Sequence, residues 1–151
     1  MSSLQQQFED IILIKDPKGQ RTITLNTKVY TIGRLSTNDI VIYDRDVSRS
    51  HATLVKQKST NSSRSILWLI DGNLKRIRST NGLFVNKKLT LNRQLQIGDL
   101  VSLGKKSTIK YYRFSRLALK KLSKRGGQLD ESTLDKMLTV TEADYKRTMV
   151  N

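Results

Sequence analysis

The chain has 151 residues, no cysteine, and 28 Lys and Arg side chains against 13 Asp and Glu, which gives a formal net charge of +15. This length corresponds to about one domain and can bury a core without disulfide or metal support. The missing cysteines exclude a disulfide framework, a thiol nucleophile and a thiolate metal site, and no apolar run approaches the roughly 20 residues of a membrane-spanning helix.

Nine short segments rich in Ile, Val, Leu, Thr and Tyr are predicted to form strands. In chain order they are Ile11–Ile14, Thr22–Leu25, Val29–Ile32, Ile40–Ile42, Ala52–Val55, Ser65–Ile70, Gly82–Val85, Leu100–Leu103 and Ile109–Phe114. Turn-forming Asp, Asn, Gly and Ser residues separate them at intervals of about ten residues, with no helical pattern in between. This arrangement predicts an all-β fold, either an antiparallel β-sandwich or a barrel.

The chain changes character near residue 114, where apolar residues recur at helical spacing among basic ones: Phe114, Leu117, Ala118 and Leu122. Gly126 and Gly127 are predicted to end this helix. Ser132 and Thr141 each stand three residues before an aspartate, a weak N-cap signal for one or two short helices in the remaining chain.

These patterns divide the chain into an N-terminal extension (1–10), a β-sandwich (11–114) and a basic, then mixed, helical tail (115–151). The first residues lack the charged start and apolar middle of a secretory signal. Together with the absence of cysteine, this fits the cytoplasm or an organelle interior such as the plastid stroma.

The only histidine, His51, lies near the residue types of a hydrolase triad: Ser48, Ser50, Asp44 and Asp46. Their closeness in sequence argues against a triad, because its partners come from separate elements, and no G-x-S-x-G turn presents a serine. One histidine without a spaced cluster of acids does not predict a metal site. We therefore expect a non-enzymatic protein without a metal or cofactor.

Anion binding is better supported by the residue types at the strand ends and turns. A phosphomonoester is nearly a dianion with three acceptor oxygens, and it is bound by a guanidinium together with hydroxyl and backbone N–H donors. Arg34, Ser48, Arg49 and Thr80 are residues of these types in loops that can converge on one end of a sandwich.

The order of the short motifs resembles the forkhead-associated (FHA) domain signature. Gly33-Arg34 is followed by Ser48-x-x-His51 and then by Thr80-Asn81-Gly82, and the resemblance extends over residues 11–114. It implies an eleven-stranded antiparallel β-sandwich of the FHA/SMAD-like type. It also implies a signalling adaptor that binds a phosphothreonine-containing protein or peptide through its loops.

The resemblance assigns roles to residues of the three motifs. Arg34 and Ser48 resemble the phosphate ligands, with Thr80 and Arg49 completing the site, and Asn81 resembles the residue that holds the peptide backbone. Asn81-Gly82 is also a good hairpin turn, so Asn81 could be structural as well. For Arg49, a salt bridge to Asp46 is an alternative to a phosphate contact.

Three residues of the signature have structural roles in the family. Gly33 and Gly82 would let the backbone turn tightly, and His51 would support the loop that carries Ser48. None of the three is expected to contact the ligand.

The sequence departs from the signature at two places. Residues 72–78 are inserted before the third motif and add Lys75, Arg76 and Arg78, which would alter the peptide groove. Lys87 replaces a glycine that often follows the next strand. Separately, Asp46, close to Ser48, predicts a preference against Asp and Glu after the phosphothreonine.

Two further partners are consistent with the charge pattern. Nine basic residues and no acid lie between Lys105 and Arg125, so an alternative function is nucleic-acid binding through this segment. Thr139 and Thr141 are candidate phosphorylation sites, and a phosphorylated tail could bind intramolecularly to the Arg34 site. No membrane partner is predicted.

Overall fold

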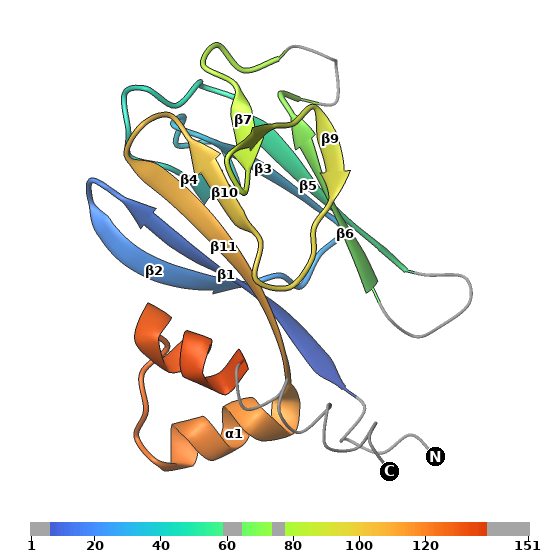
Figure 1. The fold of residues 1–151 in the computed structure, drawn as a ribbon, viewed down its shortest axis with the longest axis vertical. Coiled ribbons are helices and arrows are strands. Elements are labelled where there is room, and N and C mark those ends of the chain that lie inside the picture. Colours follow the sequence, from blue (N-terminus) through green and yellow to red (C-terminus); the bar gives the residue numbers. More distant parts are fainter. Residues whose placement is uncertain (1–6, 59–64, 74–77, 139–151) are drawn as a thin grey trace.

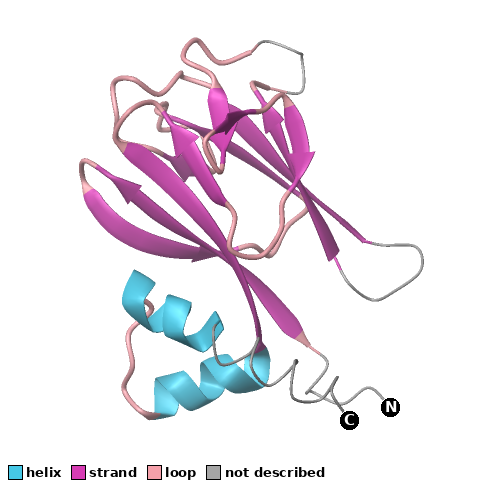
Figure 2. Cartoon of the chain, in the orientation of Figure 1, coloured by secondary structure: helices cyan, strands magenta, loops and turns pink. Residues whose placement is uncertain are grey.

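Two packed β-sheets with a helical appendage at one end make up the computed structural model, which describes residues 7–58, 65–73 and 78–138 (Figures 1 and 2). The six-stranded sheet has the order β2-β1-β11-β10-β7-β8 and the five-stranded sheet the order β4-β3-β5-β6-β9. This is the eleven-stranded FHA-like sandwich that the resemblance implies. No helix within the described residues is both long and apolar enough to cross a membrane.

Both sheets combine long strands with very short ones. The six-stranded sheet contains β1 (Phe8–Asp16), β2 (Gly19–Thr24), β7 (Leu83–Val85), β8 (Lys88–Leu89), β10 (Leu100–Leu103) and β11 (Ser107–Ser115). The five-stranded sheet contains β3 (Val29–Gly33), β4 (Ile40–Val41), β5 (Ala52–Lys58), β6 (Ser65–Asp71) and β9 (Asn92–Gln94). Residues 8–10, which the sequence pattern assigns to an N-terminal extension, belong to β1.

Two strands and one pairing differ from the sequence-based prediction. β8 and β9 were not predicted because they are short and mostly polar, with five residues in total over Lys88–Leu89 and Asn92–Gln94. The pairing of β3 with β4 is parallel, with Ile32 opposite Ile40. Such pairings depend on the tertiary fold, because neither strand has enough alternating residues to show its direction or register.

The run Ile11–Ile14 does not alternate because β1 is buried on both faces. Ile12 and Ile14 face the core between the sheets. Ile11 and Leu13 face the opposite side, where they pack with residues of β11 and the helical appendage in a second apolar cluster. The appendage therefore covers the outer face of the six-stranded sheet, and each apolar side chain of this strand is withdrawn from water.

The appendage begins with α1 (Arg116–Lys124). Ser115 is its N-cap and accepts a hydrogen bond from the Ala118 N–H at 3.1 Å. Gly126, with φ of +73°, follows the C-cap residue of α1, and the helix ends at the glycines as predicted.

A second helix spans 131–138, and its N-cap is Asp130 rather than the predicted Ser132. The Asp130 Oδ1 accepts the Thr133 N–H at 2.8 Å, and this bond lowers the pKa of the carboxyl. The prediction that Ser132 is the N-cap is therefore wrong. Ser and Asp are both good N-caps, so the residue types alone do not show which of the two precedes the helix. Only the tertiary position of the helix, with Leu134 fully buried against the sheet, decides between them.

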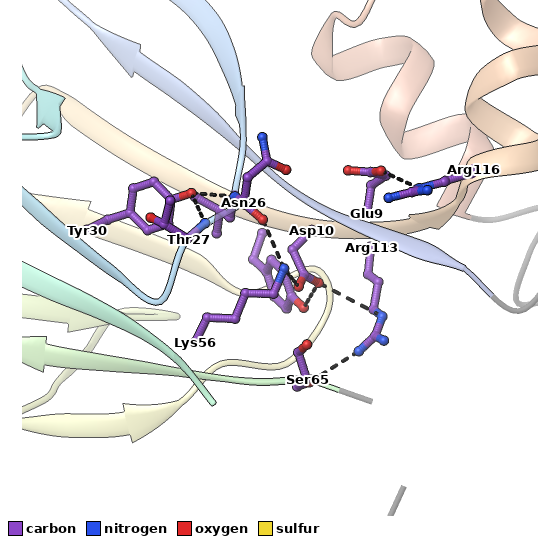
Figure 3. A network of polar contacts seen from close by, with 11 residues as sticks. Glu9, Asp10, Asn26, Thr27, Tyr30, Lys56, Ser65, Arg113 and Arg116 are labelled. Carbon is purple, nitrogen blue, oxygen red and sulfur yellow. Dashed lines mark hydrogen bonds and ion pairs between the residues drawn. The ribbon is translucent and has the colours of Figure 1, made fainter. Parts of the chain in front are cut away.

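A buried ionic network joins the two sheets at the end near the appendage (Figure 3). The Asp10 carboxylate of β1 accepts the Tyr111 hydroxyl at 2.6 Å and pairs with the Lys56 Nζ at 3.0 Å. The Arg113 Nε lies 3.9 Å from the same carboxylate and its Nη1 donates to the Ser65 carbonyl at 3.2 Å. Burial and the neighbouring carboxylate raise the pKa of the Tyr111 hydroxyl.

Candidate functional site

Three loops lie together at the end of the sandwich opposite the appendage (Figure 1). They are residues 34–39 between β3 and β4, residues 42–51 between β4 and β5, and residues 78–82 before β7. We call these loops the rim. They contain the three motifs predicted from the sequence, except for Gly33, which is the last residue of β3.

Ser48 and Thr80 connect two of the rim loops directly. The Ser48 Oγ accepts the Thr80 backbone N–H at 2.8 Å, although the two residues are 32 positions apart in sequence. Because this oxygen accepts, the hydroxyl proton of Ser48 remains available to donate outward. The side chain of Thr80 is exposed, so its hydroxyl is available as a second donor on the same side.

Arg34 is attached to the same group through its backbone. Its N–H donates to the Ser48 carbonyl at 3.1 Å, and its side chain is exposed. The backbone of Arg34 is thus hydrogen-bonded to Ser48, and the side chain of Ser48 is hydrogen-bonded to the backbone of Thr80. These three predicted site residues are adjacent on the rim.

His51 is fully buried and connects three segments of the site. Its Nδ1 accepts the Ser48 N–H at 2.9 Å, so its Nε2 carries the proton and donates to the Gly82 carbonyl at 2.7 Å. Burial lowers the pKa of the imidazole, which is therefore neutral near pH 7. Both ring nitrogens bond to backbone groups, so His51 is not available as a general base.

The two signature glycines are required for different reasons. A Cβ at Gly33 would lie 2.1 Å from the Arg49 carbonyl oxygen, so this position needs glycine because the next loop packs directly against it. The sequence analysis expects both glycines to let the backbone turn tightly, but Gly33 is not among the glycines with a positive φ. Gly82 is, with φ of +85°, next to the carbonyl that His51 holds.

Asn81 has a structural contact within the rim. Its Nδ2 donates to the Asp46 carbonyl at 2.7 Å and so connects loop 78–82 to loop 42–51. The side-chain oxygen and a second N–H proton are not used in this bond, and Asn81 is exposed. The structural role is therefore observed, and the remaining groups can still bind a peptide backbone.

Arg49 is exposed, and within the described part of the chain it forms no ion pair with Asp46 or another acid. Its carbonyl accepts the Asn38 Nδ2 at 2.7 Å. The same amide donates to the Leu35 carbonyl at 3.0 Å, so Asn38 holds the first two rim loops together. Sequence reasoning missed Asn38, because nothing in "STND" distinguishes a bridging asparagine from a turn asparagine.

The insertion at residues 72–78 adjoins the rim. Gly72 donates its N–H to the His51 carbonyl at 2.7 Å, and the Ser79 N–H donates to the Asp71 Oδ1 at 3.2 Å, which fixes the two ends of this segment. Lys75 and Arg76 lie outside the described residues, as do Thr139 and Thr141 of the tail. Arg78 is described and exposed.

The rim can bind an anion by simple chemistry. It presents one exposed guanidinium at Arg34, hydroxyl donors at Ser48 and Thr80, and a second exposed guanidinium at Arg49. The backbone bonds described above hold these groups in place before any ligand arrives, which reduces the ordering cost of binding.

Comparison with known proteins identifies the family of this chain. The FHA domain family model matches residues 30–104, which include the whole rim. The chain belongs to the FHA domain family. FHA domains generally bind phosphothreonine peptides and are typically non-catalytic binding modules.

Solved structures support the assignment of the FHA fold. The crystal structure of the Slr1951 protein from Synechocystis is 36% identical, with a TM-score of 0.66, and the match covers 69% of this chain and 97% of that one. A structure from a study of phosphothreonine-dependent FHA domain interactions is 28% identical, with a TM-score of 0.56, covering 69% of this chain and 95% of that one.

A curated relative is much longer than this chain. The uncharacterized protein sll1895 of Synechocystis is 37% identical over 100 residues, which cover 66% of this chain and 14% of that protein. The chain therefore spans about one seventh of the length of the curated relative that it matches.

Proposed function

We propose that this FHA domain binds a phosphothreonine-containing protein through Arg34, Ser48 and Thr80, and so acts as an adaptor controlled by a kinase. The observation that supports this most is the 2.8 Å bond from the Thr80 N–H to the Ser48 Oγ. It joins two loops from distant parts of the chain and leaves the serine hydroxyl proton free to donate to a ligand, while the Arg34 N–H bonds to the carbonyl of the same serine.

In this proposal the phosphate oxygens are shared among complementary donors. The Arg34 guanidinium supplies charge-assisted bonds to a dianion, and these are stronger than bonds between neutral groups. The Ser48 and Thr80 hydroxyls donate to the remaining oxygens. Arg49, which is unpaired in the described part of the chain, adds positive charge at the same place.

The peptide backbone is held by Asn81. Its Nδ2 already donates one proton to the Asp46 carbonyl at 2.7 Å. That bond fixes the side-chain plane, so the amide oxygen can accept a peptide N–H and the second amide proton can donate to a peptide carbonyl. With one phosphate and a few backbone bonds, we expect a micromolar Kd, about −8 kcal/mol.

The test uses a peptide library with a fixed phosphothreonine, the same library with threonine, and a generic oligonucleotide at two salt concentrations. Arg34→Ala should weaken binding of the phosphopeptides by roughly 2–3 kcal/mol, a 30- to 150-fold rise in Kd, because it removes charge-assisted bonds. Binding is measured by calorimetry or fluorescence anisotropy.

Arg125→Ala is the matched control, since it removes the same charge from the far end of the molecule, after α1. It should leave phosphopeptide binding unchanged. Equal binding of phosphorylated and unphosphorylated libraries by the wild type, or full phosphopeptide binding by Arg34→Ala, would show that the proposed function is wrong.

A further inference from the structure

The turn between β10 and β11, residues 104–106, packs against the rim. A Cβ at Gly104, where φ is +65°, would lie 3.0 Å from the Cβ of Asp46. Next to the turn, the Ser107 Oγ donates to the buried Asp44 carboxylate at 2.6 Å. Both contacts attach the turn to loop 42–51, which also carries Ser48, and Figure 1 shows the turn at the same end of the sandwich as the rim.

This contact brings a pair of lysines to the rim. Lys105 and Lys106 are exposed, and so is Arg45 on the adjoining loop. Within the described residues, none of the three belongs to an ion pair. We call Arg45, Lys105 and Lys106 the basic ridge.

Positive charge continues from the ridge onto the turn between β1 and β2. Tyr43, at the start of loop 42–51, is half exposed, and its N–H donates to the Asp16 Oδ2 at 2.9 Å. The Lys18 Nζ lies 4.1 Å from the centre of the Tyr43 ring, and the Arg21 guanidinium lies 5.4 Å from it. The Arg21 charge is partly offset by Asp16, with which it pairs at 3.0 Å. A ligand that extends from the proposed phosphate site across loop 42–51 would therefore meet the exposed Asp46 together with several cations.

We propose that the basic ridge is a second anion subsite, which selects phosphothreonine ligands that carry a further anionic side chain a few residues from the phosphothreonine. The shared chemistry of that side chain is a carboxylate or a second phosphate. This inference rests on the proposed function of the rim and specifies the class of ligand that the rim accepts.

The proposed anion subsite leads to the opposite expectation from the one that the sequence analysis draws from Asp46. That expectation considers Asp46 as the only charge near the flanking residues of the ligand, and it predicts a preference against acidic ligand residues. In the structure the turn with Lys105 and Lys106 packs directly on Asp46, so the local net charge is positive. Exposed charges act mainly within a Debye length, about 8 Å at physiological ionic strength, so these neighbours outweigh charges elsewhere on the molecule.

The structure also separates the basic residues that the sequence groups together as a nucleic-acid footprint. Lys105 and Lys106 precede β11, whereas α1 follows it, and nine residues at about 3.3 Å each put roughly 30 Å between them. Between the two ends, Lys110 pairs with Asp135 at 2.9 Å and Arg113 lies near Asp10. A single continuous cationic surface along residues 105–125 is not formed, which favours a peptide over a nucleic acid at the ridge.

The experiment measures Kd for phosphothreonine peptides that carry alanine, glutamate or phosphoserine at one flanking position. This position is moved in turn along both sides of the phosphothreonine. Wild type should bind the glutamate peptide about three- to tenfold more tightly than the alanine peptide at the favoured position, and the phosphoserine peptide more tightly still. The gain should shrink at high salt because the ridge is exposed.

The double variant Lys105→Ala/Lys106→Ala should lose this gain while retaining binding of the alanine peptide within about twofold. Lys120→Ala/Lys121→Ala, which removes the same charge from α1, is the matched control and should keep the gain. Because both pairs are exposed, folding should be unaffected, which a thermal melt of each variant verifies.

The outcomes separate this inference from the proposed function. If the alanine phosphopeptide binds but no acidic position improves it, or if both double variants lose affinity equally, the ridge is not an anion subsite. If no phosphopeptide binds the wild type, the proposed function fails first. If a generic oligonucleotide binds more tightly than the acidic peptides and depends on Lys105 and Lys106, the ridge is a nucleic-acid surface and the inference is wrong.

Discussion

At the scale of single residues, His51 shows how the site is held without taking part in binding. It bonds through one ring nitrogen to the loop that carries Ser48 and through the other to Gly82, beside Asn81. Both bonds require the neutral ring with its proton on Nε2, because Nδ1 accepts. Protonation would place a charge in a fully buried position and remove the bond to Ser48.

Stability of the domain should therefore fall at mildly acidic pH. Burial lowers the pKa of folded His51 below its ordinary value of 6.5, so the unfolded chain binds the proton first as pH falls. The free energy of unfolding should be constant above about pH 7 and decrease below about 6.5, by at most about 1.4 kcal/mol per pH unit. Urea denaturation at several pH values measures this.

His51→Asn is the control for this titration, because asparagine can donate and accept but does not titrate in this range. The variant should be less stable than wild type but should show little change between about pH 5.5 and 7. A wild type with the same stability at both pH values would mean that His51 does not control it.

At the scale of elements, the turn between β7 and β8 contains Lys87 at the position where the family often has a glycine. Asn86 and Lys87 connect these strands and have φ values of 51° and 71°. Positive φ at both positions is the type I′ turn, for which Asn-Gly is the preferred pair. Lys87 therefore keeps the usual turn geometry while adopting a conformation that costs a side chain about 1 kcal/mol.

Lys87→Gly should stabilise the domain by about 0.5–1 kcal/mol, because it relieves this conformation, and the exposed side chain contributes no buried contact. The melting temperature should rise by a few degrees. Lys88→Gly is the matched control: it lies in β8 and should be neutral or destabilising. Equal effects of the two substitutions would contradict the turn argument.

At the scale of the whole molecule, the two ends of the sandwich differ in exposure and in the kind of polar contacts they contain. The rim is exposed and basic, and at the other end a buried carboxylate, Asp10, accepts bonds from both sheets through Tyr111 and Lys56 (Figure 3). Such a network does not need to add net stability, but removing one member leaves buried charges without a partner. It joins the two sheets whose loops form the rim.

Asp10→Ala should destabilise the domain by about 3 kcal/mol or more, because Lys56 and Arg113 would lose their shared carboxylate. Glu9→Ala is the neighbouring control. Glu9 pairs with Arg116, which is 57% exposed, so its loss should cost less than about 1 kcal/mol. Chemical denaturation of both variants distinguishes the two, and similar losses would show that the network does not hold the sheets.

Much of the fold was predictable because long strands carry clear apolar patterns. β1, β5, β6 and β11 were each predicted in part, and the helix after residue 114 was found with its terminating glycines. The short polar strands β8 and β9 were missed. A two- or three-residue strand is specified by its neighbours in the sheet rather than by its own residues.

The members of the candidate site could be proposed from the sequence, but the contacts between them could not. Spaced motifs indicate Arg34, Ser48 and Thr80, and no local pattern could show that the Ser48 Oγ accepts the Thr80 N–H at 2.8 Å. For the same reason the bridging role of Asn38 was not foreseen. Hydrogen bonds between loops depend on where the strands beneath them pair.

An all-β domain with an FHA signature follows from the amino-acid sequence alone, since strand periodicity and motif order are local properties of the chain. The charge around the proposed phosphate site follows instead from the tertiary fold. The strand pairing puts the turn of Lys105 and Lys106 against Asp46, 58 positions before Gly104 in the sequence, and moves the other cations of that basic segment to the opposite end. The electrostatic effect of a charged side chain depends on its distance from the ligand in space. The order of the charged residues along the chain therefore does not predict this effect.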